Sequence, residues 1–157
     1  MRRFGSPPLP GQRYRLRPGA YAILAEGGDV LVTHQTDPSP EYQLPGGGID
    51  PGEHPVPALM RECLEETGWT LSRPRRLGAF RRFTYMPEYK LWAEKLCTIY
   101  LASPVQRRGP PAEAGHSAVW MPADVAAKTL AVDGDRHFVR QVFGLGTLSK
   151  RTPLRSS

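Results

Sequence analysis

The sequence predicts an α/β fold in which a mixed sheet is flanked by helices. Three observations predict it: strand-like apolar runs at residues 21–25 and 30–33, a helical segment that begins at Pro55, and two further helical segments between residues 123 and 143. Strands and helices that each carry one apolar face bury those faces by packing in layers. At 157 residues, the chain suits one domain with a single core, and we expect an ordered core at residues 18–146 between basic or polar tails.

The first elements form a hairpin that leads into a glycine-rich loop. Residues 21–25 and 30–33 flank a Gly-Gly-Asp turn at residues 27–29. Residues 42–44 form a short extended piece before the glycines. Residues 1 to about 18 are rich in proline, glycine and arginine and show no period, so we expect them to form a tail.

A helix follows the glycine-rich loop. Proline suits the first helical turn at Pro55, and Gly68 suits the helix end. Beyond it, we expect strands at residues 76–85, 95–102 and 117–120. We expect helices at residues 123–130 and 135–143, a loop at 104–114 and a polar tail at 147–157. The apolar positions of the first helix gather on one arc, which we expect to be buried: Val56, Leu59, Met60, Cys63 and Leu64.

Composition excludes a membrane-spanning protein. Apolar residues make up 39% and charged residues 23% of the chain, and no apolar run approaches the roughly 20 residues that cross a bilayer. The N-terminus has arginines but no apolar segment of a signal peptide. We expect Cys63 and Cys97 to be buried thiols, neither a disulfide nor a metal pair, which fits a cytoplasmic location.

Charge is distributed unevenly along the chain. Residues 46–69 contain five acids and one base, a net charge of −4. Because the whole chain carries +6, the rest of the chain carries +10. An acidic centre in a basic protein is typical of a metal site that acts on polyphosphates, because the carboxylates hold the cation and the basic rim attracts the anion. A basic surface is equally typical of nucleic-acid binding, so this alternative stays open.

Three glutamates lie on one face of the first helix. At about 100° per residue, Glu62, Glu65 and Glu66 fall within roughly 100° of arc. Like charges at these spacings destabilise a bare helix by a few tenths of a kcal/mol each. A divalent cation reverses that effect because it takes oxygen ligands. A solvated acidic face is the alternative interpretation of the glutamates alone.

Polar residues and glycines recur at fixed spacings around these glutamates. The positions are Gly47, then after five residues Glu53, after seven Arg61-Glu62-Cys63, after one Glu65-Glu66, and after one Gly68-Trp69. This spacing resembles the Nudix box of the MutT-type hydrolases. The resemblance implies a Nudix α/β/α sandwich and a pyrophosphohydrolase that acts on phosphoric anhydride bonds of a nucleoside diphosphate linked to another moiety.

The resemblance also implies roles for individual residues. It places a catalytic Mg²⁺, for which Mn²⁺ is a substitute, on the carboxylates of Glu62, Glu65 and Glu66 and on the backbone carbonyl of Gly46. It assigns Glu53 and Arg61 to a structural ion pair between loop and helix, although direct metal contact by Glu53 stays open.

The general base stays unresolved at this stage. Related enzymes take it from the box or from a later loop, and the candidates here are Glu66, Glu94, Glu113 and His116. We include Glu113 among the catalytic residues because it precedes the strand expected at residues 117–120. A solvated loop carboxylate is the alternative.

Substrate choice depends on residues outside the box. Arg81, Arg82, Tyr85 and Trp92 offer phosphate contacts and a stacking face for a base. Tyr85 resembles a tyrosine that marks dinucleoside-polyphosphate hydrolases, although strand packing explains it equally. Nucleoside triphosphates or dinucleoside polyphosphates are therefore our first expectation. ADP-ribose or nucleotide sugars, RNA 5′ ends, and a nucleotide-sensing domain without catalysis are the alternatives.

The expected partner is a small-molecule nucleotide. We expect no membrane and no nucleic acid as partners. A homodimer is left open, since nothing in the sequence identifies an interface.

Overall fold

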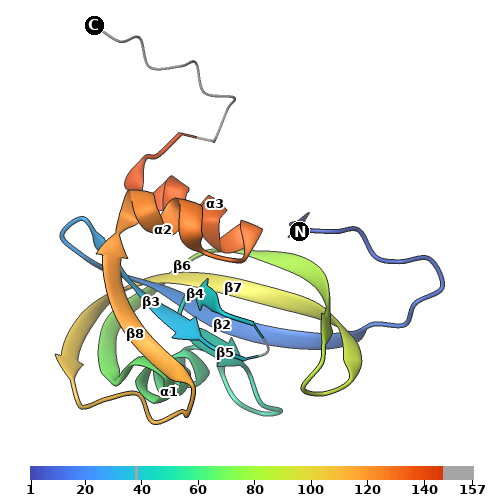
Figure 1. Ribbon diagram of the computed structural model, residues 1–157, viewed down its shortest axis with the longest axis horizontal. Helices are drawn as coiled ribbons and strands as arrows, with labels where there is room; N and C mark the ends of the chain where they lie inside the picture. Colours follow the sequence, from blue (N-terminus) through green and yellow to red (C-terminus); the bar gives the residue numbers. More distant parts are fainter. Residues whose placement is uncertain (38, 147–157) are drawn as a thin grey trace, which may run out of the picture.

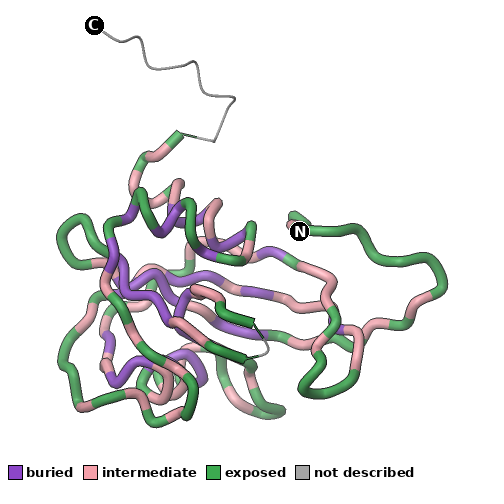
Figure 2. Tube along the Cα trace, in the orientation of Figure 1, coloured by how far each residue is buried: buried purple, intermediate pink, exposed green. Residues whose placement is uncertain are grey.

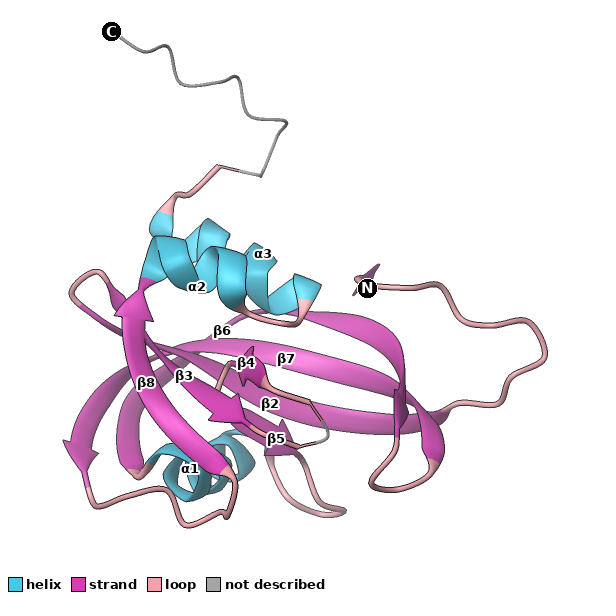
Figure 3. Ribbon diagram, viewed as in Figure 1, coloured by secondary structure: helices cyan, strands magenta, loops and turns pink. Residues whose placement is uncertain are grey.

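An eight-stranded mixed sheet forms the centre of the computed structural model, which describes residues 1–37 and 39–146 (Figure 1). One helix covers one face of the sheet and two helices cover the other, which is the α/β/α sandwich expected from the resemblance (Figure 3). The elements in chain order are β1 (Arg2–Arg3), β2 (Arg15–Glu26), β3 (Asp29–Gln35), β4 (Glu41–Gln43), β5 (Gly46–Gly48), α1 (Pro55–Thr67), β6 (Trp69–Met86), β7 (Leu91–Arg107), β8 (His116–Pro122), α2 (Ala123–Thr129) and α3 (Asp133–Phe143).

The long strand β2 organises the sheet. One edge of β2 pairs in parallel with β7 from Arg15, opposite Ala93, to Leu24, opposite Ala102. Its other edge pairs in antiparallel fashion with β5 at residues 19–21 and with β3 at residues 24–26. The glycine segment is therefore a short strand held against the middle of the sheet.

The core consists of two apolar clusters, one on each face of the sheet. Figure 2 shows where the buried residues lie along the strands and helices. Side chains alternate along β2, so Ala20, Ala22 and Leu24 pack toward α1, whereas Ile23 packs in the cluster that contains α2 and α3. Leu59 and Cys63 fix α1 on its face through complete burial. Both cysteines are free and buried, as predicted.

Helix α1 has the boundaries that its proline and glycine predict. Pro55 occupies the first turn, and Gly68 ends the helix in the left-handed conformation with φ of 77°. The Gly68 N–H donates to the Leu64 carbonyl. A Cβ atom on Gly68 would lie only 1.9 Å from the Gly109 carbonyl oxygen, so this position excludes every other residue type.

Replacing Gly68 by alanine should destabilise the protein by about 3 kcal/mol, because backbone strain and a clash with backbone act together. Gly27→Ala is the matched control: its φ is 60°, yet nothing lies within 4 Å of the added Cβ. The control should cost only about 1 kcal/mol. Urea unfolding of both variants checks this, and equal losses of stability would contradict the packing argument.

The N-terminal residues, which composition predicts to be a tail, lie along the sheet. β1 pairs in parallel with β6, placing Arg2 opposite Phe80, and β2 already begins at Arg15. Phe4 packs edge-on against Phe80, with ring centroids 5.4 Å apart. Hydrogen-bonded pairing depends on the backbone and tolerates arginine side chains, so composition conceals it.

The remaining differences concern strand ends. β6 and β7 are longer than predicted because they pair with each other from Trp69, opposite Arg107, to Met86, opposite Leu91. The polar tail predicted at residues 147–157 lies outside the described residues. Within the described part of the chain, no helix is both long and apolar enough to span a bilayer.

Candidate active site

The strand β5 and the helix α1 bring the carboxylates of the site together. The Gly46 N–H donates a hydrogen bond of 3.0 Å to the Glu66 carboxylate. Gly47 lies against Glu62 so closely that an added Cβ would lie 2.6 Å from the Glu62 carboxyl carbon. The helix therefore presents its acidic face to a backbone that leaves room for nothing larger than glycine.

Burial disfavours the ionised forms of these carboxylates. Desolvation raises the pKa of Glu66 well above its ordinary value, and the nearby Glu62 and Glu113 charges raise it further. Desolvation likewise raises the pKa of Glu62, against the lowering effect of Arg61. Clustered carboxylate oxygens with too little positive charge around them are the donors that a hard divalent cation prefers.

A loop before β8 completes the acidic cluster. The backbone N–H groups of Ala112 and Glu113 donate to the Glu65 carbonyl at the end of α1, at 2.8 and 3.3 Å. Ligand atoms of Glu66, Glu113 and His116 lie within 4.8 Å of one another, as do those of Glu62, Glu65 and Glu113. Oxygen donors thus come from two separate elements, and this donor set fits Mg²⁺ or Mn²⁺.

His116 adds a nitrogen to this cluster. Its Nε2 lies 3.3 Å from a Glu113 carboxylate oxygen. Its Nδ1 is buried and, within residues 1–37 and 39–146, has no hydrogen-bond partner. The imidazole is therefore placed to orient the Glu113 carboxylate.

Arg61 ties the loop to the helix. Its Nε and one terminal nitrogen donate to the two Glu53 carboxylate oxygens at 3.0 and 2.9 Å, a bidentate ion pair. Its other terminal nitrogen donates to Glu62 at 3.0 Å. The Asp50 N–H also donates to Glu53, and together these bonds lower the pKa of the Glu53 carboxyl. Within this network, Glu53 faces Arg61.

The acidic cluster forms one wall of a pocket of about 300 Å³. Arg17 and Lys95 line the same pocket, so positive side chains share the space with the carboxylates. The Arg17 guanidinium also lies 4.6 Å from the centre of the Tyr89 ring. Sequence reasoning missed these residues because Arg17 was assigned to the tail. Lys95 lies in a strand that the sequence predicts, but only the pairing of that strand with β2 and β6 sets it opposite Arg17 and Arg82.

The four residues predicted to bind substrate separate into two groups. Tyr85 and Trp92 are cross-strand partners with ring centroids 5.2 Å apart, and Arg81 alternates onto their face. Arg82 pairs opposite Lys95, which lines the acidic pocket. Glu94, a candidate base, lies 3.7 Å from Arg81 and alternates to the face opposite that of Lys95.

An alanine at Gly47 should reduce turnover about tenfold to a hundredfold while leaving stability nearly unchanged. The atoms nearest to its Cβ would be those of the Glu62 carboxylate, which is flexible enough to move away and would then leave its working position. Gly28→Ala, where nothing lies within 4 Å, controls for the loss of a glycine. Steady-state kinetics and thermal unfolding check this; unchanged turnover would show that Glu62 needs no such placement.

A buried carboxyl lies behind the pocket. Asp135, at the start of α3, is 4% exposed and accepts a hydrogen bond from the Leu44 N–H. Desolvation raises its pKa to about 7, although Arg82, Lys95 and Arg136 oppose the shift. Burial also lowers the pKa of Lys95. A small cavity is lined by Asp135, Arg82 and Lys95, and it shares Lys95 with the acidic pocket.

Asp135 should make the protein less stable as pH rises. Its folded-state pKa of about 7 exceeds the ordinary 3.8, so between these values the folded protein binds more protons than the unfolded chain. The free energy of unfolding therefore falls with increasing pH and levels off above 7. Relative to Asp135→Asn, the wild type should lose about 3 kcal/mol between pH 5 and 8 in urea unfolding. Parallel pH profiles would contradict the assignment.

Comparisons with known proteins agree with the site. Residues 13–142 match the NUDIX domain. An 8-oxo-(d)GTP phosphatase of Mycolicibacterium smegmatis is 33% identical over 114 residues, which cover 72% of this chain and 33% of that protein. An RNA pyrophosphohydrolase of Acidiphilium cryptum is 43% identical over 61 residues, covering 36% of this chain and 37% of its own. The chain thus spans well under half the length of these two relatives.

Solved structures share the fold. The MutT NUDIX hydrolase of Burkholderia pseudomallei superposes with a TM-score of 0.68 at 23% identity, covering 82% of this chain and 98% of that one. A NUDIX hydrolase of Nitrosomonas europaea gives 0.67 at 16% identity, over 83% and 90%. With a family match over most of the sequence, an α/β/α sandwich and the acidic helix face against a glycine strand, this chain belongs to the NUDIX domain family.

Proposed function

We propose that the protein is a Mg²⁺-dependent pyrophosphohydrolase that cleaves a nucleoside diphosphate linked to another moiety. One observation carries the proposal: carboxylates of Glu62, Glu66 and Glu113 share a pocket with Arg17 and Lys95. Acidic and basic walls in one pocket suit a cation and a polyphosphate together. Glu62, Glu65, Glu66 and the Gly46 carbonyl would hold the cation.

The residues of the pocket divide the reaction between them. Bound Mg²⁺ supplies positive charge that neutralises the diphosphate oxygens. Arg17 and Lys95 orient the phosphates from the opposite wall. A water oxygen forms a bond to one phosphorus, Glu113 accepts the water proton, and the bond from that phosphorus to the bridging oxygen breaks. The bridging oxygen leaves with the second phosphate, giving two phosphorylated products.

Nucleoside triphosphates and dinucleoside polyphosphates are the substrates we favour. A relative named for 8-oxo-(d)GTP supports a free nucleotide, and it aligns with most of this chain. RNA 5′ ends are the second candidate, supported by relatives named RNA pyrophosphohydrolase. Arg15 and Arg17 favour it as well, because they line a groove of about 450 Å³ beside the glycine loop, where further phosphates would fit.

A substrate panel with and without Mg²⁺ tests the proposal. The panel contains ordinary and oxidised nucleoside triphosphates, dinucleoside polyphosphates, ADP-ribose, nucleotide sugars and a 5′-triphosphorylated RNA. We expect Mg²⁺-dependent cleavage of the nucleoside triphosphates and the dinucleoside polyphosphates. Strongly salt-dependent cleavage of the RNA alone would favour the second candidate. Nucleotide binding without any cleavage would favour a sensing domain and contradict the proposal.

Two further properties accompany this function as proposals. We infer a cytoplasmic protein from its two free thiols, because oxidising compartments favour disulfides. We leave open a homodimer, for which sedimentation at several protein concentrations is the measurement.

A further inference from the structure

Three basic side chains lie in a row across the sheet. Arg17 on β2 is opposite Lys95 on β7, and Lys95 is opposite Arg82 on β6. Neighbouring strands are about 4.8 Å apart, and residues that are opposite each other on them point to the same face of the sheet. The row therefore places three positive charges side by side.

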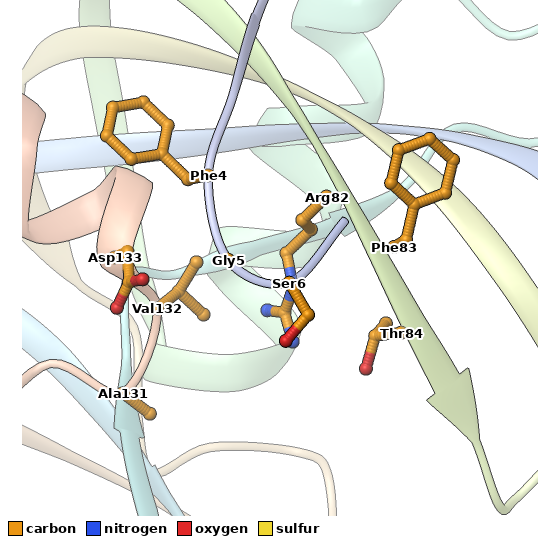
Figure 4. A pocket seen from close by; sticks show the side chains of 9 residues that line it. All are labelled: Phe4, Gly5, Ser6, Arg82, Phe83, Thr84, Ala131, Val132 and Asp133. Atoms are coloured by element: carbon orange, nitrogen blue, oxygen red, sulfur yellow. The ribbon is translucent and has the colours of Figure 1, made fainter. Parts of the chain in front are cut away.

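The two ends of the row differ in their surroundings. At one end, Arg82 and Lys95 both interact electrostatically with the buried Asp135 carboxyl. Arg82 also lines a pocket of about 230 Å³ beside the N-terminal segment and Asp133 (Figure 4). At the other end, Arg17 makes no ion pair and no side-chain hydrogen bond within residues 1–37 and 39–146. Arg17 thus has a like charge as its neighbour and no anion as its partner.

The side chain of Arg17 lies against an aromatic ring instead. Its guanidinium carbon is 4.6 Å from the centre of the Tyr89 ring. The face of an aromatic ring carries negative potential and attracts a cation at this distance. Both side chains line the acidic pocket. The ring therefore holds Arg17 beside the pocket, against the repulsion of Lys95.

Tyr89 belongs to the tight turn between β6 and β7 (Figure 1). The two strands stay paired up to this turn, with Met86 opposite Leu91. The Tyr89 N–H donates to the Met86 carbonyl at 3.2 Å, and the Lys90 N–H donates to the Pro87 carbonyl at 3.3 Å. Lys90 takes the left-handed conformation with φ of 50°. The hairpin thus gives the backbone under Tyr89 a defined position next to the pocket.

We propose that Tyr89 is a positioning residue whose ring holds the Arg17 guanidinium at the acidic pocket, where Arg17 binds the phosphates of the substrate. Without the ring, repulsion by Lys95 and the regained rotamer freedom turn Arg17 toward solvent. Tyr89 then acts on the phosphates through Arg17 alone. The inference rests on the proposed function for the presence of phosphates in the pocket, and it adds the residue that places the group that binds them.

Binding of methylenediphosphonate in the presence of Mg²⁺, measured by calorimetry, tests the inference without hydrolysis. This probe carries no base, and its P–C–P bridge cannot be cleaved. Tyr89→Ala should weaken binding about threefold to fivefold, and Tyr89→Phe should restore it because the ring face remains. Tyr89 is 56% exposed, so both variants should fold. Pro87→Ala, at an exposed position of the same turn, controls for a loosened turn and should bind like the wild type.

A double-mutant cycle separates an effect through Arg17 from any other effect of Tyr89. Arg17→Ala should weaken binding at least as much as Tyr89→Ala does, and the double variant should bind no more weakly than Arg17→Ala alone. A further loss in the double variant, a normal affinity in Tyr89→Ala, or an equal loss in Pro87→Ala would overturn the inference. So would a wild type that does not bind the diphosphonate.

Kinetics on a cleaved nucleotide provide a second measurement. Tyr89→Ala should raise KM by a similar factor and leave kcat nearly unchanged, because Arg17 binds the phosphates equally before and during the reaction. A loss confined to kcat would contradict the positioning role. Diphosphonate binding that depends on Tyr89 supports the inference even in a protein that cleaves nothing. An active enzyme whose diphosphonate binding ignores Tyr89 overturns the inference and leaves the proposed function standing.

Discussion

Glu66→Gln should reduce metal-dependent turnover by at least about a thousandfold and leave the fold intact. Glu66 is the buried carboxylate that joins α1 to β5, and it lies within ligand distance of Glu113 and His116. A glutamine keeps an oxygen that accepts the Gly46 N–H but removes the negative charge that a cation requires. Turnover at saturating substrate and Mg²⁺ measures the effect.

The stability of this variant provides an independent check. Since burial raises the pKa of Glu66, its ionised form costs free energy in the metal-free protein, and Glu66→Gln should unfold in EDTA at the same or a higher temperature. Glu26→Gln, at an exposed end of β2, is the matched control and should retain turnover. Near-normal activity in Glu66→Gln would remove this residue from the site.

Glu113→Gln should lower kcat by about 10²- to 10⁴-fold, the range expected when a general base is lost. Glu113 approaches the acidic helix from a separate loop, and its backbone is hydrogen-bonded to the end of that helix. His116 orients its carboxylate from 3.3 Å.

Glu94→Gln is the control for this experiment. Glu94 is another candidate base in the sequence, but it contacts Arg81, and strand alternation directs it to the face opposite that of Lys95, which lines the pocket. It should keep normal kcat. If raising the Mg²⁺ concentration restored the kcat of Glu113→Gln, Glu113 would be a cation ligand, and its assignment as the general base would be wrong.

The sequence predicts the parts of the site that depend on local rules. Pro55 and Gly68 mark the ends of α1, and the 3.6-residue period places Glu62 and Glu66 on one face of it. The turn at residues 27–29 likewise predicts the β2–β3 hairpin. In each case the determining interactions lie within a few residues along the chain.

Residues that reach the site from distant strands escape such rules. Arg17 sits in a stretch whose composition indicates a tail, yet parallel pairing with β7 places it opposite Lys95. In the sequence, Asp135 is an ordinary acidic residue in the first turn of a helix. Only the packing of α3 on the sheet buries it. Register between strands that are far apart in sequence decides these neighbours.

Binding of Mn²⁺, followed by electron paramagnetic resonance in the absence of substrate, tests the central claim most directly. Carboxylate sites that accept Mg²⁺ also accept Mn²⁺, which is paramagnetic. We predict that the wild type and Glu26→Gln remove free Mn²⁺ from solution equally, and that Glu66→Gln does not. Equal uptake by all three proteins would contradict a cation site built on the acidic face of α1.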